Sequence, residues 1–447
     1  MEIVWGQINK KFNGSVELYK RARELFPYGT QLFSRRPELY ALGQAPIYFE
    51  RAKHGHFWDV DGNEFIDTCM GIGPVTLGYC YEPIDAAAKA QIDKGVIGTV
   101  NNELEIQVAD LMVEMVLCAE MIKFCKSGGG ADAIAVRIAR GYTGKDVVLF
   151  CGYHGWHDWY ISANLKSEST LNEHLMPGIS TKGVPSALVR TCIPFQYNNL
   201  DSLRDTLKRF EGKVACIIME ATRFKHPDEG YLEGVRQLAD EHKCVLIFDE
   251  VVTGFRQALG GAQQYYGVTP DLATFGKGIA NGYPLAAVAG KKEIMASQYD
   301  NFISSTYYSD TVSLAAGLAT LNELKTKPVI ETMKRTGKKI TAGLQELIEK
   351  HKIKAGINGH SNHFVMAFDY GEQTNKVSTL FTQEMVARGV YCSGMFYICY
   401  THTQQDVEKI LAAADETFGI LSKGIEQEQI DELLKAPVRQ LGFKRLV

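Results

Sequence analysis

Between about residue 84 and residue 310, the chain alternates between two hydrophobic patterns. Short, almost continuous apolar runs are separated by segments in which apolar residues recur every three or four positions. The runs predict buried strands and the periodic segments predict amphipathic helices. Strands are predicted over 147–150, 214–219, 244–248 and 285–289, and a helix over 104–124. Apolar strands separated by helices are typical of a mostly parallel sheet covered on both faces.

The two ends of the chain have a different texture. Helices are predicted over 15–26, 314–324, 329–351 and from 405, and strands over 47–49, 56–67, 363–368, 390–391 and 396–399. Asp61-Gly62-Asn63 has the composition of a hairpin turn inside the second of these strands. We therefore expect an α/β fold with a large domain over 71–315 and a smaller α+β domain built from 1–70 and 316–447.

Composition excludes several classes of function. The 447 residues carry a net charge of −4 without a basic stripe, which argues against a nucleic-acid partner. No apolar segment approaches the roughly 18 residues of a membrane span, and the first residues lack the pattern of a signal peptide. The ten cysteines show no Cys-x-x-Cys spacing, which is typical of reduced thiols. We expect a cytoplasmic enzyme.

Two residues near strand ends have the chemistry that pyridoxal phosphate requires. Lys277 lies just past the short apolar run 273–275, and Asp249 directly follows the predicted strand 244–248. A lysine forms a Schiff base with this cofactor, and a carboxylate keeps the pyridine nitrogen protonated so that the ring accepts electrons. Neither residue is informative alone. Together with the motifs that follow, they predict pyridoxal 5'-phosphate as the cofactor.

A glycine-rich turn, Ser127-Gly128-Gly129-Gly130, precedes a predicted helix. Glycines let the backbone point N–H groups at an anion, and the helix dipole adds positive potential there. The turn therefore suits the phosphate of a cofactor. A glycine run before a helix is also common in ordinary loops. It lacks the Gly-Lys-Ser/Thr end of a Walker motif.

A second turn follows the strand 147–150 and contains Tyr153, His154 and His157. An aromatic residue at such a strand end can stack on a flat ring, and the adjacent histidine can hold the carboxylate that binds the ring nitrogen. A buried aromatic turn is the alternative. A metal is not expected, because the two histidines share a face only in a helix and the glycines here disfavour one.

Glu220 follows the strand 214–219 and completes a set of polar residues at strand ends. In an open parallel sheet, ligands bind beyond the carboxyl ends of the strands. Tyr153, Glu220, Asp249 and Lys277 all lie at or just past such ends, so the topology would gather them into one crevice. Because Phe248 precedes Asp249 and Val251-Val252 follow closely, we expect Asp249 to be buried and partnered.

Several longer motifs resemble the class III aminotransferases. Residues 245–256 read VLIFDEVVTGFR and residues 274–285 read TFGKGIANGYPL. Residues 57–63 (FWDVDGN) and 136–140 (VRIAR) also look like this family. The resemblance spans roughly residues 25–415. Within the family, the layout is most similar to the glutamate-1-semialdehyde aminomutase branch.

The resemblance implies a fold-type-I homodimer whose active sites are shared between subunits. Lys277 would form the Schiff base and move the proton, and Asp249 would pair with the pyridine nitrogen. The other implied positions are Val251 and Tyr153 on the two ring faces, Ser127, Gly128 and Gly129 at the phosphate together with Thr306 of the partner subunit, and Glu220 near the donor carboxylate or the phenolic side of the cofactor.

The chain departs from the family at positions that bear on the reaction. Gly129-Gly130 replaces Thr/Ser-Glu in the phosphate loop, and Met70-Gly71-Ile72 replaces the Gly-Thr-Trp of the aminomutases. Because a mutase must retain its intermediate by closing a gate, the second change favours an intermolecular aminotransferase with a donor such as L-glutamate. Tyr283, Tyr307 and Tyr308 would suit a sugar-derived acceptor, as in 8-amino-3,8-dideoxy-manno-octulosonate transaminase.

Other activities stay open at this stage. Glutamate-1-semialdehyde 2,1-aminomutase is the first alternative, and a racemase or decarboxylase on the same fold is another. A non-catalytic protein that binds the cofactor would be expected to lack Lys277 or Asp249, and both are present. Arg35 and Arg36 could bind a substrate carboxylate, although adjacent arginines on a loop are more often solvated.

Overall fold

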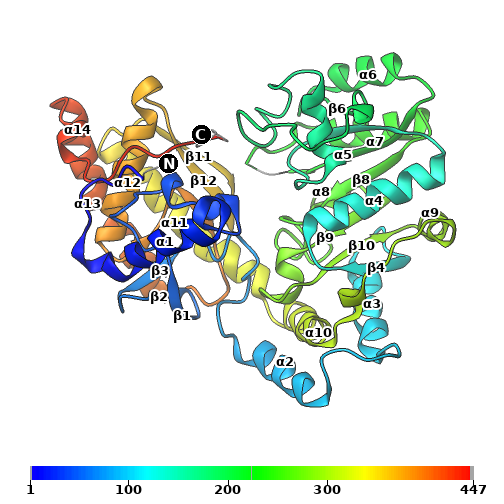
Figure 1. Ribbon diagram of the computed structural model, residues 1–447, viewed down its shortest axis with the longest axis horizontal. Helices are drawn as coiled ribbons and strands as arrows, with labels where there is room; N and C mark the ends of the chain where they lie inside the picture. Colours follow the sequence, from blue (N-terminus) through cyan, green and yellow to red (C-terminus); the bar gives the residue numbers. More distant parts are fainter. Residues whose placement is uncertain (1–2, 223, 443–447) are drawn as a thin grey trace. The chain divides into compact units, whose positions relative to one another are not determined.

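The computed structural model describes residues 3–222 and 224–442. The chain forms two compact units, labelled by element in Figure 1. One unit comprises the described residues up to Ile72, the short segment Thr76–Tyr81 and the described residues from Glu331 onward. The other comprises Gly73–Val75 and Glu82–Ile330. The first unit is therefore built from both ends of the chain, and the second is essentially one continuous stretch.

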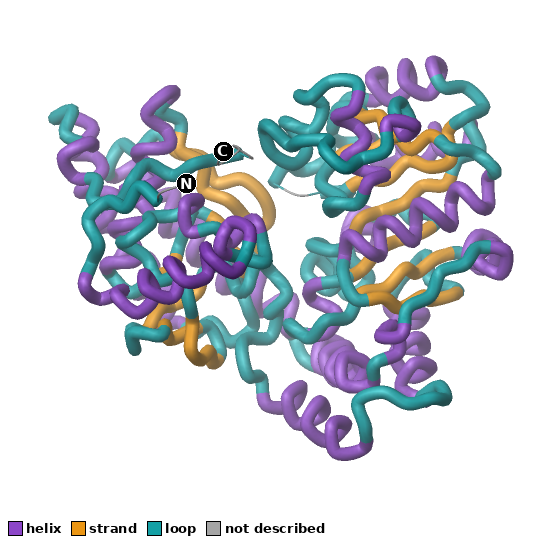
Figure 2. The backbone as a smooth tube through the Cα atoms, viewed as in Figure 1, coloured by secondary structure: helices purple, strands orange, loops and turns teal. Residues whose placement is uncertain are grey.

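The second unit is organised around a seven-stranded sheet, which Figure 2 shows as neighbouring orange strands. In spatial order the strands are β4 (Met121–Cys125), β10 (Ala286–Gly290), β9 (Leu272–Phe275), β8 (Val245–Asp249), β7 (Val214–Met219), β5 (Val147–Cys151) and β6 (Cys192–Pro194). Strand β10 pairs antiparallel with both β4 and β9, and it alone runs opposite to the other six strands. The pairs from β9 to β6 are all parallel. The predicted α/β fold with a mostly parallel sheet is confirmed, and the structure gives this sheet seven strands.

Helices cover both faces of this sheet because alternate strand residues point to opposite sides. On β7, Cys216 and Ile218 pack in one core cluster with the apolar residues of α4 (Gly128–Thr143). Ile217 and Met219 pack in another cluster with α6 (Leu200–Arg209) and α7 (Tyr231–Glu241). Both faces of the central strands are therefore buried, which explains their almost unbroken apolar sequences.

The helix predicted over 104–124 is wrong in its second half. Helix α3 covers Glu103–Met115 and starts with a capping box between Asn102 and Glu105. The chain then turns, and Met121–Cys125 becomes β4, paired antiparallel with β10. A short apolar run fits the period of a helix or of a strand, and here the pairing with β10 decides between them.

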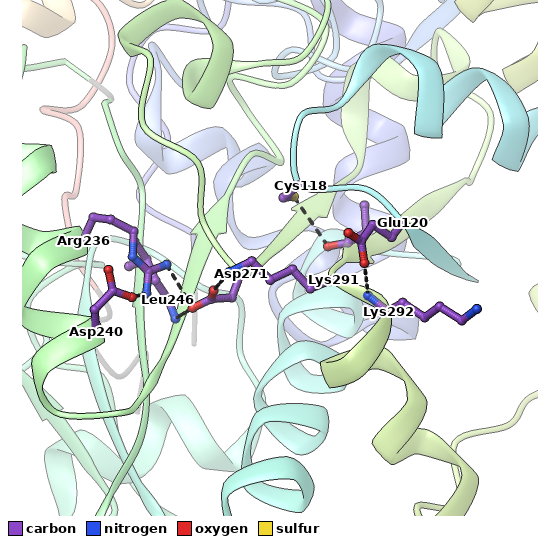
Figure 3. Close-up of polar contacts among 9 residues, drawn as sticks. Cys118, Glu120, Arg236, Asp240, Leu246, Asp271, Lys291 and Lys292 are labelled. Atoms are coloured by element: carbon purple, nitrogen blue, oxygen red, sulfur yellow. Dashed lines mark hydrogen bonds and ion pairs between the residues drawn. The ribbon is translucent and has the colours of Figure 1, made fainter.

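Asp271 anchors the edge of the sheet where β8 and β9 begin, as the close-up in Figure 3 shows. Its carboxylate accepts from the Leu246 backbone N–H at 2.8 Å, from Arg236 Nη1 at 2.9 Å and from Lys291 Nζ at 2.6 Å. These partners lie in β8, in α7 and just after β10. One buried carboxylate thus ties three elements together at the edge opposite the strand ends that carry Asp249 and Lys277.

The first unit contains two smaller sheets. One joins β1 (Phe49–Lys53), β2 (His56–Asp59), β3 (Glu64–Asp67) and β13 (Val390–Tyr391), and the other joins β11 (Ala355–His360), β12 (His363–Phe368) and β14 (Met395–Tyr397). The parallel pairing of β13 with β3 links the two ends of the chain. Between β2 and β3, Gly62 takes a positive φ of 85° in the turn, as a hairpin of this composition requires.

The remaining main helices are α1 (Asn13–Leu25), α2 (Glu82–Lys94), α10 (Thr311–Thr326), α11 (Val329–Lys350), α12 (Thr374–Ala387) and α13 (Gln404–Glu426). Within residues 3–222 and 224–442, no helix combines the length and the apolar character needed to cross a bilayer.

Candidate active site

The glycine-rich turn forms the first turn of α4. Ser127 caps this 16-residue helix, and its Oγ accepts a hydrogen bond from the Gly130 N–H at 3.2 Å. A Cβ on Gly128 would lie only 2.7 Å from Cγ1 of Val251, so glycine is required at this first residue of the helix that follows β4. The turn therefore presents N–H groups at a helix N-terminus, the arrangement that binds phosphate groups.

Gly129, where the family usually has Thr or Ser, is explained by the close approach of Gly155. A Cβ on Gly129 would lie 3.2 Å from Cα of Gly155, and a Cβ on Gly155 would lie 2.8 Å from Cα of Gly129. Gly155 also has a φ of +90°, which side chains strongly disfavour. The glycine turn and the turn after β5 thus pass in backbone contact, and the departure from Thr/Ser at 129 lets them do so.

Asp249 and His154 form a buried pair beyond the ends of β8 and β5. His154 Nδ1 lies 2.8 Å from Asp249 Oδ2, and the two side chains are 0% and 4% exposed. The other oxygen, Oδ1, accepts from the Val251 N–H at 3.0 Å. His154 Nε2 lies 3.2 Å from the Cys151 carbonyl oxygen. A carbonyl only accepts, so Nε2 carries a proton, and the Nδ1–Oδ2 contact needs a further proton between ring and carboxylate.

Lys277 lies two residues beyond the end of β9, next to the same loops. Gly276, the residue before it, approaches both of them: a Cβ there would lie 3.4 Å from Cγ1 of Val251 and 3.5 Å from Cα of Gly128. Lys277 itself has a φ of +38°. A left-handed conformation in a residue other than glycine is a strained geometry that clusters at functional sites. The lysine backbone is thus held against the glycine turn and the Asp249 loop.

Tyr153 and Glu220 are joined through the backbone. The Tyr153 N–H donates to Glu220 Oε2 at 3.0 Å, and Glu220 is only 6% exposed at the end of β7. The Tyr153 ring is 37% exposed and packs edge-on against Tyr160. Glu220 therefore orients the turn that carries Tyr153 and His154, in addition to any contact with a ligand.

Thr306 and the three tyrosines lie elsewhere in the same unit. Thr306 begins the short helix Thr306–Ser309, and Tyr308 in this helix lies under the Lys123 amine of β4 at 5.8 Å. Tyr307 is 65% exposed. The hydroxyl of Tyr283 donates to Asp85 Oδ1 at 3.0 Å. The suggested role of Thr306 needs a second subunit and stays a prediction.

One residue of the site was missed from the sequence. Asp132, in the second turn of α4, is 2% exposed and accepts a hydrogen bond from Thr274 Oγ1 at 2.7 Å. A carboxylate oxygen of Asp132, a ring nitrogen of His154 and a carboxylate oxygen of Asp249 all lie within 4.8 Å of one another. The sequence feature that could have identified Asp132 is its position among the core residues of an amphipathic helix. A charged residue is rare there unless its charge is neutralised or paired.

The expectation about the adjacent arginines is wrong for Arg36. This side chain is 1% exposed, its guanidinium lies 3.9 Å from the centre of the Phe33 ring, and Nη2 donates to the Gly442 carbonyl at 3.2 Å. Arg35 is exposed. Arg36 is therefore a buried structural cation of the first unit.

The site fits pyridoxal phosphate on three independent grounds. The glycines at the start of α4 place their backbone N–H groups at a helix N-terminus, where phosphate groups bind. A buried carboxylate, already paired with a histidine, can partner a protonated ring nitrogen. A lysine follows the neighbouring strand.

Comparison with known proteins agrees. The model of the aminotransferase class-III family matches residues 40–422. The chain belongs to this family. It is a transaminase that depends on pyridoxal phosphate, the cofactor of the class-III enzymes.

Relatives and solved structures extend over almost the whole chain. The chain is 34% identical to the 3-aminobutyryl-CoA aminotransferase of Cloacimonas acidaminovorans, covering 92% of this chain and 98% of that protein. It is 35% identical to the glutamate-1-semialdehyde 2,1-aminomutase of Methanothrix thermoacetophila, covering 92% and 97%. The pyridoxal-phosphate form of the FumI protein from Sphingopyxis sp. MTA144 superposes with a TM-score of 0.85 at 25% identity, covering 95% and 98%.

Proposed function

We propose that this class-III enzyme transfers an amino group between two separate molecules, from a donor such as L-glutamate to a carbonyl acceptor. The observation that carries the proposal is the buried Asp249–His154 pair beside the strand that leads to Lys277. Strands β8 and β9 are neighbours in register, with Asp249 opposite Thr274. The acid that would hold the ring and the lysine that would move protons thus come from adjacent strand ends.

When bound, pyridoxal phosphate withdraws electrons from the carbon that carries the transferred amino group. The residues of the chain would bind and orient the reactants and move the proton. The amine of Lys277 takes the proton from the donor carbon and returns it to another carbon, as a positioned general base and acid. Asp249, with His154 behind it, keeps the ring nitrogen protonated.

Binding and orientation fall to the surrounding loops. The N–H groups of Gly128 and Gly129 and the hydroxyl of Ser127 would hold the phosphate. Val251 and Tyr153 would lie against opposite sides of the ring. Glu220 fixes the turn of Tyr153 by accepting a hydrogen bond from its backbone N–H, and it would act near the donor carboxylate or the phenolic side of the cofactor.

Two classes of acceptor follow from different observations. The relation to a 3-aminobutyryl-CoA aminotransferase favours a 3-oxoacyl thioester. The tyrosines 307 and 308 would suit a polyhydroxylated sugar acid of the 8-amino-3,8-dideoxy-manno-octulosonate type; Tyr283 contributes less to this argument because Asp85 binds its hydroxyl. Intramolecular transfer, as in the aminomutase relatives, is the alternative reaction.

We also infer a homodimer. The second unit exposes large apolar side chains, among them Val100 (83%), Tyr299 (84%) and Phe302 (83%). These exposed apolar side chains are candidates for the contact between two copies. A second copy would also bring Thr306 of the partner subunit to the phosphate, as the family resemblance implies. All ten cysteines are unpaired, nine of them buried, which supports a cytoplasmic location.

The test is a donor–acceptor balance. The purified enzyme is incubated with L-glutamate and, in separate reactions, acetoacetyl-CoA, a 3-deoxy-8-oxo-octulosonate and glutamate-1-semialdehyde. We expect 2-oxoglutarate to form in equal amount to the aminated product with one of the first two. Turnover of glutamate-1-semialdehyde alone, without 2-oxoglutarate, would show a mutase and overturn the proposal.

A further inference from the structure

The second buried acid of the site has no role in the mechanism above. Asp132 is 2% exposed in α4, and its carboxylate lies within 4.8 Å of side-chain atoms of Asp249 and His154. Two carboxylates cannot both stay charged in such a place without a large cost, because burial removes water and the like charges repel. One proton must therefore be shared between them.

The hydrogen bonds indicate which carboxyl holds that proton. Asp132 Oδ1 accepts from the Thr274 hydroxyl at 2.7 Å. Asp249 already faces two donors, the Val251 N–H at Oδ1 and the ring of His154 at Oδ2. A carboxyl surrounded by donors is stabilised as the anion, which favours Asp249. Among the described residues, Asp132 receives one neutral donor, the Thr274 hydroxyl, and is therefore the better site for the proton.

The electrostatics agree with the hydrogen bonds. Burial raises the pKa of the Asp132 carboxyl well above its usual range, and the nearby Asp249 charge raises it further, against the hydrogen bond from Thr274. Glu220 also contributes to the rise. The positive end of the α4 dipole opposes it weakly, since this effect is confined to the first turn and Asp132 lies in the second.

We propose that Asp132 is a positioning residue, a protonated acid that donates a hydrogen bond to Asp249 and holds it as the anion that partners the cofactor ring. An ionised carboxylate offers about four acceptor positions. Val251, His154 and Asp132 would fill three, which leaves one for the protonated ring nitrogen. Asp132 touches neither substrate nor cofactor and acts through Asp249. The role of Asp132 toward the cofactor ring rests on the proposed function, but the protonation of Asp132 can be tested without cofactor.

The first experiment uses the ligand-free protein. In infrared spectra at neutral pH, a protonated carboxyl absorbs in a C=O region where carboxylates do not. We expect a band in the difference between wild type and Asp132→Asn. In Thr274→Val the same band should move to higher frequency, because Oδ1 loses its donor. Absence of the band would overturn the proposal, whether or not the protein binds pyridoxal phosphate.

The pH dependence of unfolding gives a second readout on the ligand-free protein. Asp132 faces Asp249 after β8, His154 after β5, Glu220 after β7 and the neutral Thr274 of β9. A raised pKa in the folded state contributes stability at low pH that is lost as the pH rises through the folded value. Wild type should therefore lose stability relative to Asp132→Asn as the pH rises. Parallel profiles would contradict a protonated Asp132.

The third experiment tests the role toward the cofactor. Asn keeps a donor toward Asp249 and an acceptor for Thr274, whereas Leu keeps neither. We expect Asp132→Asn to bind pyridoxal phosphate within about twofold of wild type, and Asp132→Leu to bind about tenfold more weakly. Equal weakening in both variants would assign a packing role and overturn the proposal. If wild type itself bound no cofactor, the proposed function would fail while the infrared result still decided the proton.

Discussion

Two glycines that touch through their backbones, Gly129 and Gly155, set the geometry of the phosphate turn. Alanine at 155 would combine a strained φ of +90° with a Cβ 2.8 Å from Gly129. We expect Gly155→Ala to lower the free energy of unfolding by about 1–3 kcal/mol and to weaken binding of pyridoxal phosphate. Urea unfolding and equilibrium dialysis measure both.

Gly144 provides the control for that substitution. It ends α4 with a φ of +65°, and nothing lies within 4 Å of the position where a Cβ would be. Gly144→Ala should cost about 1 kcal/mol from backbone strain alone and leave cofactor binding intact. If both variants bound the cofactor like wild type, the close approach at Gly129 would not shape the site.

The N-terminus of α13 carries a pH-dependent contact in the first unit. Thr403 and Asp406 form a capping box, and Asp406 Oδ1 lies 2.9 Å from His56 Nε2 of β2. Burial acts to raise the pKa of Asp406, but the His56 and Thr403 hydrogen bonds outweigh it and lower the value to about 2. The Asp406 hydrogen bond raises the pKa of His56 against burial.

The signs of these shifts define a pH window. The lowered pKa of Asp406 contributes stability above about pH 4 that is lost as the pH falls toward about 2. The raised pKa of His56 contributes stability that is lost as the pH rises through its folded value, above about 6.5. Asp406→Asn should therefore cost about 1–2 kcal/mol near pH 5–6 and less at either extreme. Asp415→Asn removes a more exposed carboxylate of the same helix, which pairs with Lys350 and His351. Because exposed ion pairs contribute little, this variant should cost less throughout; identical profiles would refute the assignment.

Sequence patterns located the strand ends well because both faces of the central strands are buried. Asp249, Glu220 and Lys277 were thereby expected near one edge of the sheet. The pattern failed over 104–124, where pairing with β10, a contact more than 160 residues away along the chain, decides that 121–125 is a strand. Asp132 was missed because its partner Thr274 also comes from a distant segment, and no local pattern shows which buried acid will meet which carboxylate.

A shared active site requires that two copies of the chain associate. The exposed side chains of Val100 and Phe302 should be covered in solution. We expect light scattering to give twice the 49.7 kDa of one chain, and Phe302→Asp with Val100→Asp to shift the protein toward the monomer and weaken cofactor retention. Val189→Asp, at a less exposed apolar position of the same unit (43%), is the control. A wild-type monomer with full activity would exclude the shared site.

The role of Lys277 can be measured in the visible spectrum of the purified protein with pyridoxal phosphate, recorded before and after addition of L-glutamate. We expect an absorption band that depends on Lys277 and is lost from the visible region when glutamate is added, with release of 2-oxoglutarate. Lys277→Ala should lack the initial band and lose at least about 10³-fold in turnover, since it removes the group that transfers the proton. A wild-type protein without the band, or Lys277→Ala with unchanged turnover, would show that Lys277 neither binds the cofactor nor moves the proton.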